Sequence, residues 1–312
     1  MRVCVTGGTG FIGQALVRRL LAEGHEVRVL ARPSSRADAL PALGVEIVRG
    51  DLTDTAALDG AVSGTEIVFH TAAKVSGPGT REEFFQANVT ATRHVLEACS
   101  RQTVRRVVYL SSIAVYGSAR NGEIIDESTP FDANSEGRDF YSQSKIAADW
   151  LAASFPATNT LSITIVRPGI VFGPGQPLPV ALLGFRIGRT NVIFGSPEQR
   201  FPLNYVENLV DALLLCMKPG SDSLRQYIVV DDENLTLGQY HRAKADADHS
   251  RAIFLPGWPV LVGGPLGGVP RRQVQRALED RYYRTKRIRE ELGWSPRVNL
   301  KDAIAQTLNR FT

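Results

Sequence analysis

Tyr141 and Lys145 are the first two residues whose type and spacing suggest chemistry. They stand four positions apart in Tyr141–Phe155, a stretch with the pattern of a helix. Side chains at positions i and i+4 share one helix face, so the phenol and the ammonium project in the same direction. A free phenol has a pKa of about 10, and a neighbouring ammonium lowers it. The pair predicts a general acid or base that works near neutral pH, although this spacing also occurs by chance on ordinary helices.

Two serines supply a second set of polar groups. Ser111 and Ser112 follow Arg106–Leu110, a run with the β-branched and aromatic character of a buried strand. The carboxyl ends of parallel strands face the ligand crevice of an α/β fold. A hydroxyl placed there can donate to a substrate oxygen on which charge develops. The alternative is a pair of loop serines that cap a turn.

A glycine-rich turn lies near the start of the chain, in Thr6–Gly13. It follows a predicted strand and opens a predicted helix, which is the context of a dinucleotide-binding turn. Gly7 permits the tight turn, Gly10 lets the backbone approach a pyrophosphate, and Gly13 allows close helix–sheet packing. The spacing is G-x-x-G-x-x-G, and a tight turn without a ligand is the alternative. The residues expected at the pyrophosphate are Gly7, Gly10, Phe11 and Ile12.

The end of the second predicted strand bears on the choice of dinucleotide. NAD-binding folds place an acidic residue there for the ribose diol, but this chain has Ala31 followed by Arg32 and, four residues later, Arg36. A guanidinium can bind a 2′-phosphate in a bidentate manner, so NADP(H) is the preferred cofactor and NAD(H) a possible one. Asp51, followed by Leu52, is expected at the adenine edge, or else as a turn or N-cap aspartate.

The elements that must position these residues alternate between strand and helix. Helices are predicted at Phe11–Glu23, Asp54–Val62, Glu82–Gln102 and Tyr141–Phe155. The predicted strands between them are Arg2–Thr6, Glu26–Ala31, Val45–Arg49, Ile67–His70, Arg106–Leu110 and Ser162–Arg167. This alternation predicts an α/β fold with a Rossmann-type, doubly wound parallel sheet.

The second half of the chain has a less regular pattern and predicts a smaller C-terminal substrate lobe. Residues 1–172 are expected to form the dinucleotide-binding domain, which residues 203–232 rejoin, and residues 173–312 are expected to form mainly the lobe. A helical pattern runs over Arg271–Leu292, and an apolar stretch, Ile253–Val269, is suited to wall a pocket for an apolar substrate.

Composition narrows the classes of function. The chain has 312 residues, 43% hydrophobic and 22% charged, with a formal net charge of +4. The mild and dispersed excess of basic residues does not favour a nucleic-acid partner. Three widely spaced cysteines argue against a disulfide framework and a metal site. Neither a secretory signal nor an integral membrane segment is evident, so a cytoplasmic protein with a small-molecule substrate is expected.

Taken together, these motifs resemble the extended short-chain dehydrogenase/reductase family. They cover nearly the whole chain in family order: TGGTGFIG (Thr6–Gly13), DLTD (Asp51–Asp54), HTAA (His70–Ala73), Asn88-Val89, SSIAVYG (Ser111–Gly117), YSQSK (Tyr141–Lys145), RPGIVFGPG (Arg167–Gly175), YVENLVDA (Tyr205–Ala212) and ELGWSP (Glu291–Pro296).

The resemblance assigns roles to particular residues. It implies a catalytic triad of Ser112, Tyr141 and Lys145, with Ser111 next to it and Asn88 ordering the site. It also implies a homodimer, for which Glu82–Gln102 and Tyr141–Phe155 are the candidate helices. Further cofactor contacts are implied for Ala72, Ala73, Lys74, Pro168, Gly169 and Ile170.

One departure from the family limits the reaction. Nucleotide-sugar dehydratases and the related decarboxylases carry acidic residues where this chain has Ile113 and Ala114, so elimination and decarboxylation are not expected. An oxidoreductase similar to 3β-hydroxysteroid dehydrogenases and ketone reductases, acting on a largely apolar alcohol or ketone, is the preferred prediction. A nucleotide-sugar 4-epimerase with tightly bound NAD is the alternative, with Arg186, Arg189 and Arg200 as candidate pyrophosphate ligands. A non-catalytic protein that senses NADP is the third possibility.

Overall fold

The computed structural model describes residues 1–35, 37, 40–117, 122–156, 161–176, 184–220, 222–256 and 279–308. The chain forms two compact units. The first comprises Met1–Val115, Phe140–Pro168 and Val210–Tyr227, and the second comprises Tyr116–Asp139, Gly169–Leu209 and Ile228–Thr312. The assignment of cofactor binding to the N-terminal domain and of substrate binding to the C-terminal lobe stays a prediction.

A seven-stranded sheet forms the centre of the first unit, in the order β12-β7-β5-β4-β1-β2-β3. Pairing is parallel from β7 through β5, β4, β1 and β2 to β3. The strand order reverses between β1 and β4, and the crevice at such a reversal is where open α/β sheets bind ligands. The predicted Rossmann-type fold class is therefore confirmed. The strands are β1 (Arg2–Thr6), β2 (Glu26–Ala31), β3 (Glu46–Arg49), β4 (Ile67–His70), β5 (Arg106–Leu110), β7 (Ser162–Pro168) and β12 (Leu224–Val229).

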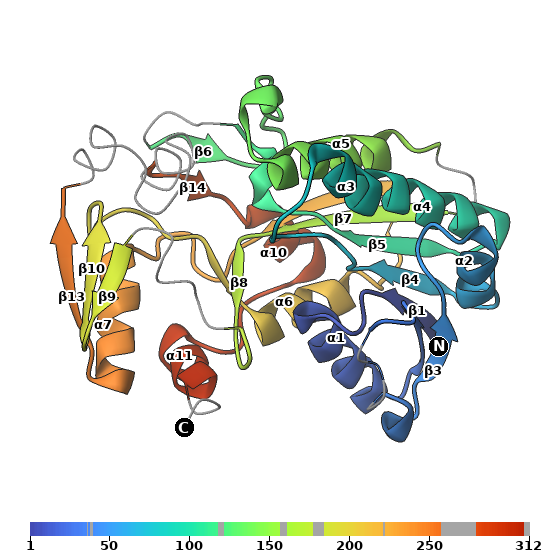
Figure 1. The fold of residues 1–312 in the computed structure, drawn as a ribbon, viewed down its shortest axis with the longest axis horizontal. Helices are drawn as coiled ribbons and strands as arrows, with labels where there is room; N and C mark the ends of the chain where they lie inside the picture. Colours follow the sequence, from blue (N-terminus) through green and yellow to red (C-terminus); the bar gives the residue numbers. More distant parts are fainter. Residues whose placement is uncertain are drawn as a thin grey trace. The chain divides into compact units, whose positions relative to one another are not determined.

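Helices cover both faces of this sheet, α2, α4 and α5 on one side and α1 and α6 on the other (Figure 1). At the starts of α2 and α3, side chains accept hydrogen bonds from backbone N–H groups that have no partner within the helix. Asp54 accepts a hydrogen bond from Ala57 N at the start of α2, and Thr80 and Glu83 form a capping box at the start of α3. The helices are α1 (Phe11–Ala22), α2 (Thr55–Val62), α3 (Arg81–Phe85), η2, a π-helical turn (Gln86–Thr90), α4 (Ala91–Arg101), α5 (Phe140–Ser154) and α6 (Val206–Leu215).

The core of the first unit lies between the sheet and the helices α2, α4 and α5. Its strand residues are apolar and fully or nearly fully buried, as both-face coverage of a parallel sheet requires. Cys4 and Cys99 belong to this cluster, and Cys216 is also a buried free thiol. Burial raises the pKa of Cys4 and of Cys216 to about 12, so both remain protonated and inert near neutral pH.

In the described part of the second unit, small sheets are accompanied by the helices α7, α10 and α11. β13, β10 and β9 form a three-stranded sheet, β8 pairs with β11, and β6 pairs with β14. Among the described residues, no helix combines the length and the apolar character needed to cross a membrane. The elements are β6 (Ile124–Ile125), β8 (Ile170–Phe172), β9 (Gly184–Ile187), β10 (Thr190–Phe194), β11 (Leu203–Tyr205), α7 (Leu237–Asp248), β13 (Arg251–Leu255), β14 (Tyr282–Tyr283), α10 (Lys286–Leu292) and α11 (Leu300–Leu308).

Residues 271–278 of the helix predicted over Arg271–Leu292 lie outside the described residues. In the described part the prediction is wrong for residues 279–285 and confirmed for Lys286–Leu292. Tyr282 and Tyr283 form strand β14, and helix α10 begins only at Lys286. Tyr283 is buried, with its ring 6.3 Å from that of Tyr116. Thr285 N donates to a Glu233 carboxylate oxygen at 2.5 Å, which ends the extended segment before the helix. Tertiary packing of the tyrosines overrides the helical pattern here.

Candidate active site

The glycine turn has the geometry that the sequence predicts. Gly7 has φ +77°, and a Cβ there would lie 2.6 Å from Ala72 N on the neighbouring strand's loop. A Cβ on Gly13 would overlap the Gly7 carbonyl oxygen, and one on Gly10 would lie 3.3 Å from it. The backbone of the turn therefore leaves no room for a side chain at Gly7 or Gly13. At Gly10 the lack of a side chain keeps the start of α1 accessible to a ligand.

The start of α1 has free donors for an anion. Gly10 is the N-cap, and no side chain caps the helix. The first backbone N–H groups of a helix have no intrahelical partner, and those of Phe11 and Ile12 belong to this set. Aligned N–H groups at a helix start favour negative charge. This uncapped helix start beside a close glycine turn fits a dinucleotide pyrophosphate.

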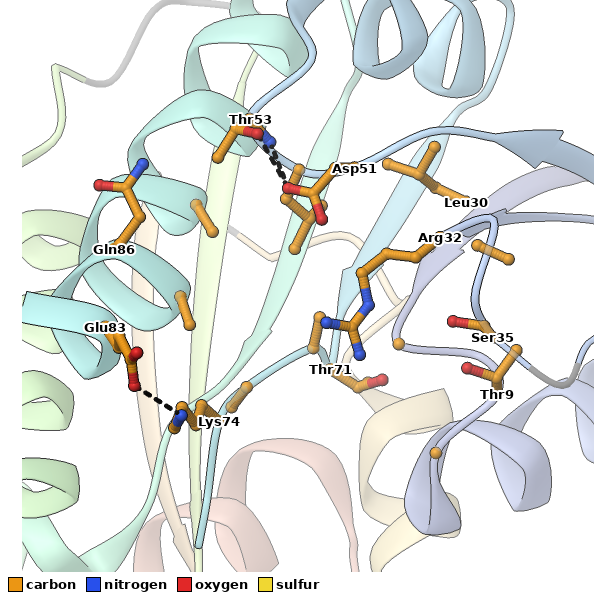
Figure 2. Close-up of a pocket in the computed structure, with 18 of the residues that line it drawn as sticks. Thr9, Leu30, Arg32, Ser35, Asp51, Thr53, Thr71, Lys74, Glu83 and Gln86 are labelled. Carbon is orange, nitrogen blue, oxygen red and sulfur yellow. Dashed lines mark hydrogen bonds and ion pairs between the residues drawn. The ribbon is translucent and has the colours of Figure 1, made fainter. Parts of the chain in front are cut away.

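A cavity of about 850 Å³ lies over the carboxyl ends of β1, β2 and β4 (Figure 2). It brings together eight of the predicted cofactor residues: Gly7, Gly10, Arg32, Asp51, Leu52, Ala72, Ala73 and Lys74. The lining of this cavity does not include the remaining polar candidates, which are Ser111, Ser112, Tyr141, Lys145 and Asn88.

Arg32 extends its side chain into this cavity (Figure 2). The guanidinium has no hydrogen bond or ion pair within the described part of the chain, and the residue is exposed. Its backbone carbonyl accepts a hydrogen bond from Arg49 at 3.3 Å, and the Arg49 guanidinium also reaches Ser35 O at 3.4 Å. Arg49 thus holds the loop that carries Arg32, a contact that the sequence did not reveal. Arg36 lies outside the described residues.

Asp51 forms a local turn instead of capping α2. Its Oδ1 accepts hydrogen bonds from Thr53 N at 3.0 Å and from Thr53 Oγ1 at 2.9 Å. The N-cap of α2 is Asp54. Because the Thr53 contacts fix one carboxylate oxygen, the other is oriented in a cavity wall where it can accept from a ligand amine.

The loop after β4 connects the cavity to α5 through Asn88. Asn88 lies in the π-helical turn η2, and such turns are frequent at functional sites. Its Oδ1 accepts from Lys74 N at 2.7 Å, while its Nδ2 donates to Lys74 O at 3.0 Å and to Ser144 Oγ at 2.8 Å. Lys74 Nζ is already held by Pro78 O at 3.0 Å and Glu83 at 3.3 Å.

Lys145 is buried at the end of β5. Its Nζ donates to the Tyr109 hydroxyl at 3.1 Å and to Leu110 O at 2.8 Å. Burial lowers the pKa of Lys145 to about 8, and Asp149 acts in the opposite direction. Two of the three ammonium N–H groups are thus used within the protein, which leaves the third for a ligand or for Tyr141.

Tyr141 stands one helical turn before Lys145, in the first turn of α5. Tyr141 is half-buried. Burial raises the pKa of Tyr109, and the charges of Asp149 and then of Tyr141 raise it further, so the two phenols lie near each other. The turn after Ser112, η3 (Ile113–Val115), packs against α5. The fold therefore places the three predicted catalytic residues on adjoining elements at the end of β5.

The two serines have different roles. Ser111 is buried, and its hydroxyl donates to Asp149 Oδ2 at 2.6 Å. Ser112 is only half-buried, and its Oγ accepts from Ala114 N at 3.1 Å. The Ser112 hydroxyl proton has no acceptor among the described residues, so it remains available to a substrate oxygen.

A fully buried ion pair fixes the register of α5. Arg167 on β7 donates from Nε to Asp149 Oδ2 at 2.9 Å and from a terminal nitrogen to Oδ1 at 2.7 Å, and both side chains are 0% exposed. Asp149 stands one turn beyond Lys145 on α5, so this bidentate pair holds the lysine against the end of β5. Removal of either partner would leave an uncompensated buried charge.

His70 is buried at the end of β4, beside Tyr109. Its ring stacks on Tyr109 with centroids 5.5 Å apart. Thr92 Oγ1 donates to Asn88 O at 2.5 Å, so it accepts from His70 Nε2 at 3.0 Å, and His70 Nδ1 accepts from Thr6 Oγ1 at 2.7 Å. Burial, with the Lys145 charge second, lowers the pKa of His70 to about 3. A neutral, fully bonded imidazole is a structural element here.

Comparison with known proteins decides the family. Residues 3–229 match the sequence profile of the NAD dependent epimerase/dehydratase family. The chain belongs to this family. The expected extended short-chain dehydrogenase/reductase resemblance is thereby confirmed.

Similar proteins include dehydrogenases and reductases. The 3 beta-hydroxysteroid dehydrogenase/Delta 5-->4-isomerase of Mycobacterium tuberculosis is 29% identical over 98% of this chain and 89% of that protein. The 2-alkyl-3-oxoalkanoate reductase of Stenotrophomonas maltophilia is 30% identical over 97% of each chain. The solved structure of MoeE5 in complex with UDP-glucuronic acid and NAD has a TM-score of 0.76 and 25% identity, over 100% of this chain and 99% of that chain.

This family member is an NAD(P)-dependent oxidoreductase that acts on an alcohol or ketone, as its dehydrogenase and reductase relatives indicate. These relatives support the prediction of an alcohol or ketone oxidoreductase better than the alternative of a nucleotide-sugar 4-epimerase. In the second unit, the Arg200 guanidinium is paired with Asp280 at 2.9 Å, which occupies one of the arginines considered for a nucleotide-sugar pyrophosphate.

Pro168 is the last residue of β7, and the chain enters the second unit at the next residue. There Gly169 N donates to Asn204 Oδ1 at 2.7 Å, and Ile170 N donates to Pro202 O at 2.8 Å. The predicted contact of these three residues with the nicotinamide stays a prediction.

Sequence reasoning missed the supporting roles of Arg167, Asp149, Arg49, Thr92 and Tyr109. Only Asp149 carried a detectable signal, because it is an acidic residue four positions after Lys145 on the same helix. The others look like ordinary residues of strands or of a helix: Arg49, Thr92, Tyr109 and Arg167.

Proposed function

We propose that the protein prefers NADP(H) and interconverts a largely apolar ketone and its alcohol, with Tyr141, Lys145 and Ser112 as catalytic residues. The observation that carries the catalytic assignment is the position of Lys145. Its ammonium is fixed by two hydrogen bonds at the carboxyl end of β5, one helical turn from Tyr141.

When held at the glycine turn and by Arg32, a reduced dinucleotide would supply the hydride that the carbonyl carbon receives. Tyr141 donates its phenol proton to the carbonyl oxygen, which becomes the hydroxyl of the product. The resulting phenolate is stabilised by the Lys145 ammonium. Ser112 donates its hydroxyl hydrogen to the same oxygen as negative charge develops there. The reverse steps oxidise the alcohol.

Arg32 supports the preference for NADP(H). The cavity wall at the end of β2 has Ala31 in place of an acidic residue, and the guanidinium of Arg32 lies in the cavity with no hydrogen-bond or ion-pair partner among the described residues. A 2′-phosphate would fill that role as a charge-assisted ligand. Lys74 and Asp51 are proposed as secondary contacts of the dinucleotide.

An apolar substrate is consistent with the relatives, since two of the similar enzymes carry hydroxysteroid or alkyl-oxoalkanoate names. The positions after Ser112, Ile113 and Ala114, add no acid–base group to the site. The chemistry therefore ends with transfer of a hydride and a proton.

Cofactor binding tests the proposal in two separate samples of the purified protein. One sample is denatured to release any bound dinucleotide, and we expect no stoichiometric NAD. The other stays native and is titrated with each dinucleotide, and we expect tighter binding of NADPH than of NADH. Replacing Arg32 with Ser should weaken NADPH binding by roughly 10- to 100-fold, the value of a charged hydrogen bond, and leave NADH nearly unchanged. Arg18→Gln, an exposed arginine on α1, is the control. Equal losses for both dinucleotides would refute the Arg32 assignment, and stoichiometric bound NAD would indicate the epimerase.

A further inference from the structure

Tyr109 is a buried tyrosine beside the proposed catalytic lysine. It lies near the carboxyl end of β5 and is only 1% exposed, so it does not reach the solvent or a substrate. Its hydroxyl accepts a hydrogen bond from Lys145 Nζ at 3.1 Å, and Nζ lies 4.7 Å from the centre of its ring. Nζ also donates to Leu110 O, a backbone carbonyl. In the described part of the chain, the Tyr109 hydroxyl is therefore the one side-chain group that accepts from this ammonium.

The hydrogen bonds around Tyr109 determine which way its phenol proton points. Its hydroxyl also interacts with the hydroxyls of Thr92 and Ser111. Thr92 Oγ1 donates its own proton to Asn88 O at 2.5 Å. Ser111 Oγ donates its own proton to Asp149 Oδ2 at 2.6 Å. Both hydroxyls therefore have only lone pairs left for the phenol, so the Tyr109 proton points at one of them and an oxygen lone pair remains for the ammonium.

The charged and titratable groups around Lys145 come from its own helix and from neighbouring strands. Burial lowers the pKa of Lys145 to about 8, and Asp149 on α5 opposes this effect. That carboxylate is shared with Arg167 of β7 through two hydrogen bonds, and His70 of β4 is neutral because burial lowers its pKa to about 3. Tyr141, also on α5, is the phenol that the lysine serves. The two short hydrogen bonds at the end of β5 thus contribute directly to keeping the buried ammonium in place and charged.

We infer that Tyr109 is a positioning residue whose hydroxyl holds the Lys145 ammonium in place and favours its charged form, an inference that rests on the proposed catalytic role of Lys145. A hydrogen bond accepted from the ammonium stabilises the protonated amine, and the protonated amine is the form that stabilises the Tyr141 phenolate. Without the hydroxyl, the amine would lose its proton at a lower pH. Tyr109 thereby extends turnover to more alkaline pH without touching the substrate.

NMR of the lysine side chains tests this hydrogen bond without turnover. The full-length chain has six lysines, so ¹³C-lysine labelling gives few signals, and Lys145→Arg identifies the signal of Lys145. Tyr109→Phe removes the hydroxyl and keeps the ring that stacks on His70. We expect the midpoint of the Lys145 titration to fall by about one pH unit, because a hydrogen bond to a charged group changes an equilibrium roughly tenfold or more.

Tyr205→Phe is the matched control in the second unit. Tyr205 is also buried, and its hydroxyl donates to Gln306 Oε1 at 2.6 Å, so this substitution removes the same group from another tyrosine with a side-chain partner. The Lys145 titration should stay as in the wild type. A second measurement needs no variant: in the wild type, the Lys145 Nζ protons should show a nuclear Overhauser contact with the Tyr109 ring, whose centre lies 4.7 Å from Nζ.

Turnover measures the consequence for the reaction. In Tyr109→Phe, the alkaline limb of the pH profile of kcat should move to lower pH by the same amount. KM for the ketone at neutral pH should stay within about twofold, because a group that makes no substrate contact leaves substrate binding unchanged. A merely structural tyrosine would lower the melting temperature of the variant and leave both pH dependences unchanged.

An unchanged Lys145 titration in Tyr109→Phe would overturn the inference, whether or not the protein reduces ketones. So would an equal shift in Tyr205→Phe, because the effect would then not depend on the contact with Lys145, and so would the absence of the ring contact in the wild type. A wild type that reduces no ketone would refute the proposed function instead, and the NMR comparison would still decide whether the Tyr109 hydroxyl holds the lysine.

Discussion

The dinucleotide region around Arg32 and the catalytic region around Lys145 belong to the same unit but are built in different ways. Arg32 is exposed and unpaired among the described residues, and Asp51 is fixed only by its own turn. Lys145, Asp149 and His70, in contrast, are buried, and each has at least two polar partners. Binding a 2′-phosphate tolerates adjustment of a long side chain, whereas proton transfer requires fixed positions. The contrast predicts large, pH-linked effects in the catalytic region and smaller, ligand-specific effects near Arg32.

The largest expected effect in the catalytic region is the acid sensitivity that His70 confers. Its pKa is about 3 in the folded protein and 6.5 in the unfolded chain, so below pH 6.5 the unfolded chain binds a proton that the folded protein does not. Stability is therefore lost as the pH falls from 6.5 towards 3, by up to about 5 kcal/mol. Unfolding free energies measured across this range should show a shallower decline in His70→Gln.

His249→Asn, at an exposed histidine in the second unit, serves as the control and should keep the wild-type slope. An unchanged slope in His70→Gln would mean that the buried network does not exclude the proton, and the contrast between the two regions would lose its main support.

The next effect concerns the reaction itself. Tyr141→Phe removes the phenol proton and keeps the ring, so kcat should fall by roughly 10³-fold while dinucleotide binding stays within about twofold, because general acid–base catalysis contributes this order of magnitude. Steady-state ketone reduction and fluorescence titration measure the two quantities. Turnover at the wild-type rate in this variant would remove Tyr141 from the mechanism.

The smallest of these effects distinguishes the two adjacent serines. Ser112→Ala should lower kcat by about 10²-fold with little change in melting temperature, because a lost oxyanion donor has that effect. Ser111→Ala should instead reduce stability by about 1–3 kcal/mol, because it leaves the buried carboxylate of Asp149 short of one donor. A reversed pattern, with Ser111 controlling kcat, would reassign the substrate contact.

Local sequence determined much of the fold. The strand and helix ranges of the first unit, the glycine turn and the Tyr141–Lys145 spacing follow from periodicity and from the backbone limits of glycine, which act over a few neighbouring residues. The same local signals mistook Tyr282–Tyr283 for helix, because the burial of Tyr283 against Tyr116 and the Glu233 contact with Thr285 depend on residues far away in the sequence.

The sequence by itself identified Ser112, Tyr141 and Lys145 as candidates, but it could not show what holds them. Tertiary structure alone decided that Tyr109 accepts from Lys145, that Asp149 pairs with Arg167 and that Asn88 joins Lys74 to Ser144. Each contact joins elements separated by many residues, so no short pattern records it. Tertiary structure also decided which serine is buried and which face of the β9–β10–β13 sheet is left exposed, because burial is set by the packing of whole elements against one another.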